Sequence, residues 1–108
     1  MFARNVSIRL KPNTLHDFKL TFEKEIVPTL RKQPGFRDEI CFADENSLDV
    51  TAISLWESKE QAEAYSSSTF QTVVKILDKF LDGPPKVRVA NVISSTSHKI
   101  TATTVVAA

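Results

Sequence analysis

This sequence contains one cysteine, Cys41, and only two glycines, Gly35 and Gly83. A single thiol cannot close a disulfide within the chain, and it cannot supply the paired thiolates of a structural zinc site or a metallochaperone. Two isolated glycines cannot form the glycine-rich loops that cradle phosphate groups. The composition therefore excludes disulfide scaffolds, thiolate metal centres and phosphate-loop nucleotide-binding domains.

The sequence also lacks an excess of either charge and any long apolar run. With 14 Lys and Arg against 13 Asp and Glu, the formal net charge is +1, which gives no electrostatic basis for binding nucleic acid or a membrane surface. No stretch approaches the roughly 20 apolar residues of a membrane span, and residues 1–6 do not resemble a secretory signal. We therefore expect a cytoplasmic protein with neither a nucleic-acid nor a membrane partner.

The N-terminal half predicts a strand followed by a helix. Residues 2–10 alternate between apolar and polar side chains, as strands do. Residues 15–30 place apolar side chains at helical spacing, and Pro28 is expected to kink this helix or end its regular part because proline removes a hydrogen bond. Pro34 and Gly35 then end the segment.

The C-terminal half predicts a hairpin, a second helix and a last strand. Residues 36–43 and 48–56 are two strands joined by a short polar link. Ser58 opens a capping-box pattern for a helix that begins at Lys59. Residues 86–94 form the last predicted strand. The remaining residues, 95–108, are a C-terminal extension that forms either a fifth strand or a tail.

The second helix is expected to be broken. Its two apolar stripes, before and after residues 66–69, are out of phase in one continuous helix. The intervening serines and threonine are residues that favour helix caps. We therefore expect a new helix to start near Ser68 or Thr69.

This order of elements predicts an α+β fold, the ferredoxin-like βαββαβ unit with an antiparallel sheet. Right-handed crossovers place both helices on one face of the sheet. The other face then exposes apolar side chains whichever way the strand 48–56 is turned, either Ala52 and Trp56 or Ile53 and Leu55. Because an exposed apolar face usually marks an interface, we expect a homodimer that packs sheet on sheet.

A series of helix aromatics, a proline-glycine turn and a strand end occurs in a fixed order along the chain: Phe18, Phe22, Pro28, Gln33-Pro34-Gly35-Phe36, Trp56-Glu57-Ser58-Lys59-Glu60 and Phe70. Over roughly residues 2–94 this series resembles the antibiotic biosynthesis monooxygenase (ABM) family. The resemblance implies an ABM-like domain at residues 1–94 that forms a dimeric α+β barrel. Members of the family include cofactor-free oxygenases of anthrones and quinols, heme-degrading monooxygenases and many proteins of unknown role.

The resemblance also tests two known activities of the family. Anthrone-oxidising members have an asparagine and a tyrosine at the positions of Ala52 and Ala62, and alanines offer no partner for a substrate phenol. Heme-degrading members match at Asn5 and Trp56, but their axial histidine corresponds to Val74, which cannot ligate iron. The resemblance thus argues against both activities and implies no cofactor.

Each candidate site residue has a structural alternative. Trp56 either borders a ligand cavity, as in the oxygenases, or is a core residue at a strand end. Asn5 shares a strand face with Ser7 and Arg9, and this face is either a polar barrel interior or a solvent-exposed surface. Arg9 or Arg88 would hold an anion or polarise a carbonyl in an interior face, and otherwise would form surface salt bridges.

We therefore predict a homodimeric, monooxygenase-like protein that oxidises a quinol or another electron-rich aromatic molecule without a cofactor. Asn5, Trp56 and Tyr65 are the candidate catalytic residues, and the polar groups named above are the further pocket candidates. Two alternatives stay open. One is a ligand-binding or isomerising member that uses the same cavity, and the other is a dimerisation module without catalysis.

Overall fold

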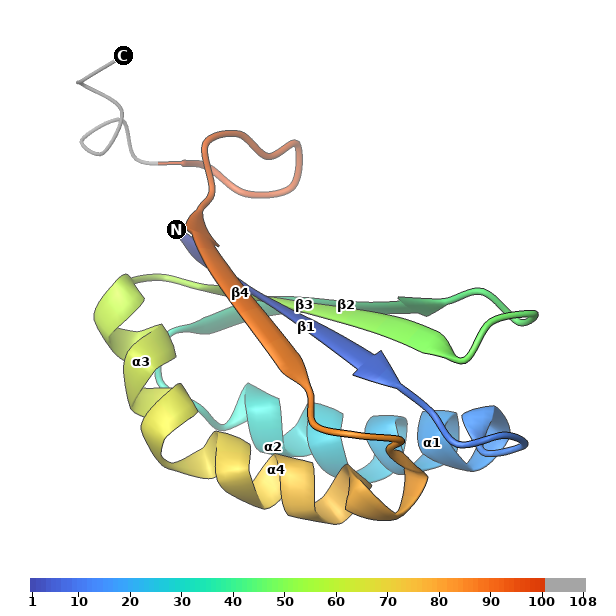
Figure 1. Cartoon of the computed structure of the whole chain (residues 1–108). Helices are drawn as coiled ribbons and strands as arrows, with labels where there is room; N and C mark the ends of the chain where they lie inside the picture. The colour runs from blue at the N-terminus through green and yellow to red at the C-terminus, as the bar shows by residue number, and fades with distance from the viewer. Residues whose placement is uncertain (101–108) are drawn as a thin grey trace.

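A computed structural model describes residues 1–100 and has the predicted βαββαβ order (Figure 1). Four strands form one antiparallel sheet in the order β2-β3-β1-β4: β1 (Phe2–Arg9), β2 (Phe36–Ala43), β3 (Asp49–Trp56) and β4 (Lys86–Asn91). The helical segments are α1 (Leu15–Thr21), the π-helical η1 (Phe22–Ile26), α2 (Val27–Arg31), α3 (Lys59–Ser67), α4 (Thr69–Leu77) and the short 3-10 turn η2 (Asp78–Phe80). The predicted α+β, ferredoxin-like fold is confirmed, although the last strand ends at Asn91 and not at residue 94.

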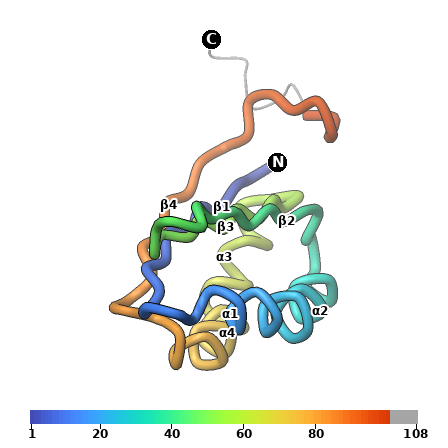
Figure 2. The backbone as a smooth tube through the Cα atoms, turned by 90° about the vertical axis from the view of Figure 1, so that its right-hand side faces the viewer, coloured from blue at the N-terminus to red at the C-terminus, as the bar shows by residue number. Residues whose placement is uncertain are grey.

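All helices lie on one face of the sheet, and residues 92–100 lie on the other side (Figures 1 and 2). In β3, Val50, Ser54 and Trp56 are buried against the helices. Ile53 and Leu55 alternate with them and point to the uncovered face. Of the two possibilities for this face, the structure therefore selects Ile53 and Leu55. Among the described residues, no helix is long and apolar enough to cross a membrane.

The first helical segment continues through Pro28 but changes its geometry just before it. Proline has no N–H, so a carbonyl in the preceding turn loses its α-helical donor. The chain widens into the π-helical turn Phe22–Ile26, and the Thr29 hydroxyl donates to the carbonyl of Glu25 at 2.8 Å. Such π-helical turns are often found at functional sites, and Phe22 is one of the residues that line the cavity described below.

The predicted break in the second helix is confirmed at Ser68. This residue has φ −124° and ψ −81°, outside the helical region, and it separates α3 from α4. At the start of α3, the Ser58 hydroxyl accepts a hydrogen bond from the backbone N–H of Gln61 at 3.2 Å, as the capping-box pattern predicts. The break lets Tyr65 and Phe70 pack against each other, with ring centroids 5.9 Å apart.

Gly35 is a position where only glycine fits. Its φ is +80°, and a Cβ there would lie 2.1 Å from Oε1 and 2.8 Å from Cβ of Gln61. Gly83 also has a positive φ, +100°, but a Cβ there would meet nothing within 4 Å. Substitution of Gly83 therefore introduces backbone strain alone, whereas substitution of Gly35 introduces backbone strain and steric crowding.

We predict that Gly35→Ala lowers the free energy of unfolding by about 2–4 kcal/mol, since it combines a left-handed backbone penalty with overpacking. Gly83→Ala is expected to cost only the backbone part, about 1–2 kcal/mol. Urea denaturation of both variants measures the difference. Equal losses would contradict the predicted clash with Gln61.

The segment after β4 crosses the end of the sheet without forming a helix or strand up to residue 100. The N–H of Val92 donates to the carbonyl of Met1 at 2.9 Å, and His98 Nε2 lies 3.2 Å from Asp38 Oδ2 on β2. The possible fifth strand falls mainly on residues 101–108, which lie outside the described residues. The division into a domain at 1–94 and an extension at 95–108 thus stays a prediction.

Candidate ligand site

A small cavity lies between the sheet and the helices. Its volume is about 40 Å³, which is room for a few water molecules and not for an aromatic ring. Most of its lining is apolar and comes from β1, η1, α2 and α4: Val6, Ile8, Phe22, Ile26, Leu30, Phe70, Val73, Val74 and Leu77. The polar and charged residues that line it are Arg4, Glu39, Ser54 and Tyr65.

Arg4 carries a buried positive charge at this cavity. It is 2% exposed, because it shares the helix-facing side of β1 with Phe2 and Val6. Its guanidinium carbon lies 4.3 Å from the ring centroid of Phe70 and 5.1 Å from that of Tyr65, distances at which cations are attracted to aromatic faces.

The guanidinium of Arg4 has few polar partners. Its hydrogen bond among the described residues runs from Nη2 to the hydroxyl of Ser66 at 3.5 Å, and no salt bridge joins it to a carboxylate of residues 1–100. Burial lowers the pKa of Arg4, but a guanidinium stays protonated at neutral pH. A buried cation with little compensation attracts an anionic group into the cavity.

Glu39 supplies a carboxylate to the same cavity from β2. Its Cα is paired in register with that of Ser54 on β3, and its Oε2 is buried without a hydrogen-bond partner. Burial, together with the nearby charge of Asp38, raises the pKa of Glu39 to about 7. Glu39 is therefore poised to gain or lose a proton near neutral pH.

Two other titratable groups near Glu39 stay protonated. Burial raises the pKa of Tyr65 to about 12, although the positive charge of Arg4 acts in the opposite direction. Burial also raises the pKa of the Cys41 thiol to about 12, with a further contribution from Glu39. Tyr65 is thus a neutral hydroxyl at the cavity, and Cys41 is not a thiolate nucleophile.

Trp56 is packed in the core and is not among the residues that line the cavity. It is 0% exposed, and its ring stacks on Tyr65 with centroids 4.8 Å apart and an angle of 29°. Phe36 packs edge-on against it at 5.7 Å, and its Nε1–H donates to the hydroxyl of Ser54 at 2.9 Å. This arrangement favours the core alternative for Trp56. A catalytic role of Trp56 stays a prediction.

Asn5 lies on the opposite face of the sheet from Trp56 and Tyr65. In register it sits between Ile53 of β3 and Arg88 of β4. The structure thus brings Trp56 and Tyr65 together but does not bring Asn5 to them within one chain. A role for Asn5 in catalysis stays a prediction that requires this face to be enclosed by a second copy.

The other predicted pocket groups, Ser7, Arg9 and Arg88, share that uncovered face with Asn5. Arg9 forms a salt bridge with Asp49 at 3.3 Å, and both side chains are more than half exposed. This exposed pair agrees with the alternative in which Arg9 forms a surface salt bridge. Ser7, Arg9 and Arg88 line neither the cavity described above nor the groove described below.

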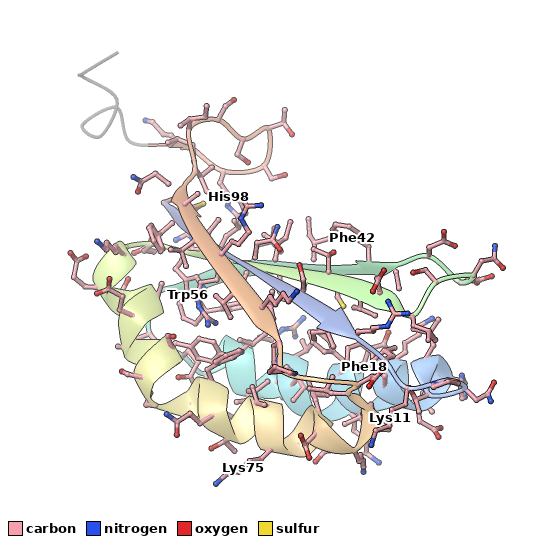
Figure 3. The ribbon with its side chains drawn as sticks, in the orientation of Figure 1. Lys11, Phe18, Phe42, Trp56, Lys75 and His98 are labelled. Carbon is pink, nitrogen blue, oxygen red and sulfur yellow. The ribbon has the colours of Figure 1, made fainter. Side chains whose placement is uncertain are left out.

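A larger groove of about 460 Å³ runs between α1, η1 and β2, within the volume range of small-molecule sites. Its lining includes Phe18, Lys19, Phe22, Glu39 and Cys41. Phe22 and Glu39 also line the internal cavity, so these two side chains separate the cavity from the groove. Figure 3 shows Phe18 and Trp56 on the helix side of the sheet, and His98 and Phe42 on the other.

Arg4 and Glu39 are the two site residues that no sequence motif marks. Arg4 occupies the one charged position in the apolar series Phe2, Val6, Ile8 and Leu10. A charge on the apolar side of a strand indicates a buried ionic group. No comparable signal marks Glu39, because polar and apolar side chains occur on both faces of β2.

A ferredoxin-like sheet with helices on one face and a bare second face is the arrangement of one protomer in the class of folds known as dimeric α+β barrels. Within this class, the chain belongs to the antibiotic biosynthesis monooxygenase family, because the model of that family matches residues 1–75. The comparison with curated proteins gives no match.

Solved structures confirm the fold at low sequence identity. The monooxygenase ActVA-Orf6 of Streptomyces coelicolor, in complex with nanaomycin D, is 20% identical, with a TM-score of 0.73 over 87% of this chain and 88% of that one. SnoaB, a cofactor-independent oxygenase from Streptomyces nogalater, is 11% identical, with a TM-score of 0.72 over 90% and 97%. NE2512 from Nitrosomonas europaea, a protein of unknown function, is 14% identical, with a TM-score of 0.69 over 88% and 91%.

Proposed function

We propose that this chain is a monooxygenase-like protein that oxidises a quinol or another electron-rich phenol with O2 and without a cofactor. The observation that carries the proposal is Arg4, a guanidinium that is 2% exposed and that lies over two aromatic rings at an apolar cavity. A cation held in a dry site stabilises a phenolate far better than water-exposed charge does. A phenolate gives up an electron to O2 more readily than the neutral phenol.

The reaction balances without an external reductant. A quinol with an unsubstituted ring carbon and one O2 give a hydroxyquinone and one water. Oxidation of the quinol to the quinone and hydroxylation of the ring carbon together supply the four electrons that O2 accepts. One oxygen atom enters the ring and the other leaves as water, so the reaction needs no electrons from a flavin, a heme or a metal.

Binding requires the site to open. The cavity of about 40 Å³ is too small for a quinol, whereas the groove beside it, about 460 Å³, is large enough. Movement of Phe22, which lines both, would join them and bring a ring in the groove toward Arg4. Phe22 is the first residue of the π-helical turn, a kind of turn that is frequent at functional sites.

The small size of the cavity also favours the second candidate function. In this alternative the chain binds a small aromatic ligand, or packs as a dimerisation module, and performs no oxidation. Oxygen consumption separates the two candidates, because only the first requires it.

We predict that the protein consumes O2 with at least one member of a panel of naphthoquinols and benzoquinols, in a ratio of one O2 per quinol and without release of hydrogen peroxide. Arg4→Met is expected to lower kcat/KM about 100-fold or more, the usual effect of removing one donor to a developing anion. Arg31→Met, at an exposed position on α2, serves as the matched control and should keep the wild-type rate.

An oxygen electrode with added catalase makes this measurement. Because catalase returns half of the O2 that is reduced to peroxide, an uptake of one O2 per two quinols would indicate simple two-electron oxidation of the quinol. Equal rates for the wild type and Arg4→Met would contradict the role of Arg4. No consumption with any quinol would favour the non-catalytic alternative.

A further inference from the structure

Of the described residues that line the internal cavity, Glu39 is the one that carries a carboxylate. Its Oε2 is buried and accepts no hydrogen bond, so this oxygen is free to take one from a ligand. Glu39 also lines the groove of about 460 Å³ beside β2. One carboxylate therefore faces both the place where a ligand ring would bind and the open path to solvent.

We propose that Glu39 is the catalytic residue that removes the phenolic proton of the substrate and releases it to solvent through the groove. This inference rests on the proposed function, because it assigns the proton acceptor of that reaction. The O–H bond of the phenol breaks, and an O–H bond forms on the carboxylate of Glu39. The negative charge moves from Glu39 to the substrate oxygen, beside the guanidinium of Arg4, so the net charge of the site does not change.

The charged groups around Glu39 fit this role. From β1 and α3, Arg4 and Tyr65 line the same cavity. From the first helical segment, Lys19 and Glu23 line the groove. Burial, together with the charge of Asp38 on its own strand, raises the pKa of Glu39 to about 7.

The competing groups near Glu39, Tyr65 in the cavity and Cys41 in the groove, do not act as bases at neutral pH. Tyr65 and Cys41 both have a pKa of about 12 and stay protonated. Among the described residues that line the cavity, Glu39 is the one whose ionised fraction changes near pH 7. Because its carboxylate form predominates only above about pH 7, kcat/KM should rise with pH through this value and then level off.

Glu39→Gln keeps the shape of the side chain and removes the base. We predict that it lowers kcat/KM about 100-fold or more, the usual contribution of a general base, and that the rise of kcat/KM near pH 7 disappears. Glu39→Asp should keep part of the rate and the pH dependence. Glu60→Gln, at an exposed position on α3 and outside the lining of both the cavity and the groove, is the matched control for the loss of one negative charge.

The variant is expected to fold. The pKa of Glu39 is raised in the folded state, so ionisation of this carboxyl weakens the fold at neutral pH, and a neutral amide removes that effect. Circular dichroism of the wild type and Glu39→Gln checks this expectation. A wild-type rate with a wild-type pH profile in Glu39→Gln would overturn the assignment of Glu39.

A second measurement does not depend on turnover. 4-Nitrophenol is largely ionised at about pH 8, and two anions in one dry cavity cannot both stay charged. Binding of its phenolate to the wild type should therefore be accompanied by uptake of up to one proton per site. Titration calorimetry in two buffers with different ionisation enthalpies measures this uptake, and Glu39→Gln should show none.

The two experiments separate the inference from the proposed function. Proton uptake by the wild type, with no oxygen consumption from any quinol, would overturn the proposed oxidation and support Glu39 as the proton acceptor of the site. Oxygen consumption that is unaffected by Glu39→Gln would overturn the role of Glu39 and leave the oxidation standing. Proton uptake that is absent in the wild type, or equal in Glu39→Gln, would also overturn the role of Glu39.

Discussion

Replacing Trp56 with alanine is expected to lower the free energy of unfolding by about 3–5 kcal/mol, the usual range for removing a buried indole. The side chain is fully buried and packs between the rings of Phe36 and Tyr65. Collapse into the space is limited, because Tyr65 is held on its other side by Phe70 and the guanidinium of Arg4. The loss therefore includes both the transfer of the indole to water and the cavity left behind.

Trp56→Phe is the matched control for this prediction. A phenyl ring keeps most of the stacking on Tyr65 but loses the Nε1–H bond to the hydroxyl of Ser54. The expected cost is about 1–2 kcal/mol, since a neutral hydrogen bond is lost and a small void is created. Urea denaturation followed by circular dichroism measures both variants.

This pair of variants decides between the two roles considered for Trp56. If the indole is a core residue, the stability falls strongly in Trp56→Ala, and Trp56→Phe keeps a quinol-oxidising activity within a few-fold of the wild type. If the indole forms part of the ligand site, Trp56→Phe loses activity although its stability is nearly unchanged. A loss below about 1 kcal/mol in Trp56→Ala would contradict the buried packing, which predicts several times more.

The periodicity of the sequence predicts most of this fold. Residues 2–10 are predicted to be a strand because their apolar side chains repeat with a period of two, and residues 48–56 because they form an extended run after a short polar link. The structure has these strands at Phe2–Arg9 and Asp49–Trp56. The break of the second helix at Ser68 is predictable for a similar reason, since a phase change between two apolar stripes cannot be absorbed by one straight helix. For the π-helical turn before Pro28, the sequence predicts only that the helix is kinked or that its regular part ends.

The candidate site could not be predicted to the same extent, because it depends on strand register. The Cα of Trp56 pairs with that of Phe2. Asn5 is three residues further along β1, an odd number, so it faces away from Trp56. The family resemblance names Asn5 and Trp56 together, but only the register shows that one chain separates them.

The same dependence on register explains why Glu39 was missed. Its strand carries charged or apolar side chains on both parities, among them Asp38, Ile40 and Cys41, so alternation alone does not show which side faces the helices. The pairing of Glu39 with Ser54, a buried residue of β3, settles its direction. The position of this carboxylate in the cavity depends on the pairing of β2 with β3, and the sequence of β2 alone does not predict it.

The uncovered face of the sheet has an apolar half and a polar half. One row of paired residues crosses it from β2 to β4: Ile40, Ile53, Asn5 and Arg88. On β2, Ile40 and Phe42 are 57% and 53% exposed. Exposed apolar side chains that lie together on one face mark a protein–protein interface, and a second copy turned by a two-fold axis would cover them.

We therefore expect the protein to be a homodimer and Ile53→Asp to dissociate it. The wild type should sediment at about twice the monomer mass of 12.1 kDa at micromolar concentration. A carboxylate at the centre of two packed sheets loses its hydration without gaining a partner. A cost of about 4 kcal/mol or more would weaken the dimer at least about 1000-fold.

Leu20→Asp is the matched control for Ile53→Asp. Leu20 is 51% exposed but lies on α1, on the helix side of the sheet, so its substitution should leave the dimer intact. Sedimentation velocity at several concentrations distinguishes the cases. A monomeric wild type would contradict the homodimer, and dissociation by Leu20→Asp alone would place the contact on the helix side. If Ile53→Asp alone dissociates the dimer, then Asn5, next to Ile53 in register, is enclosed between the two sheets, and its proposed catalytic role becomes one that only the dimer can support.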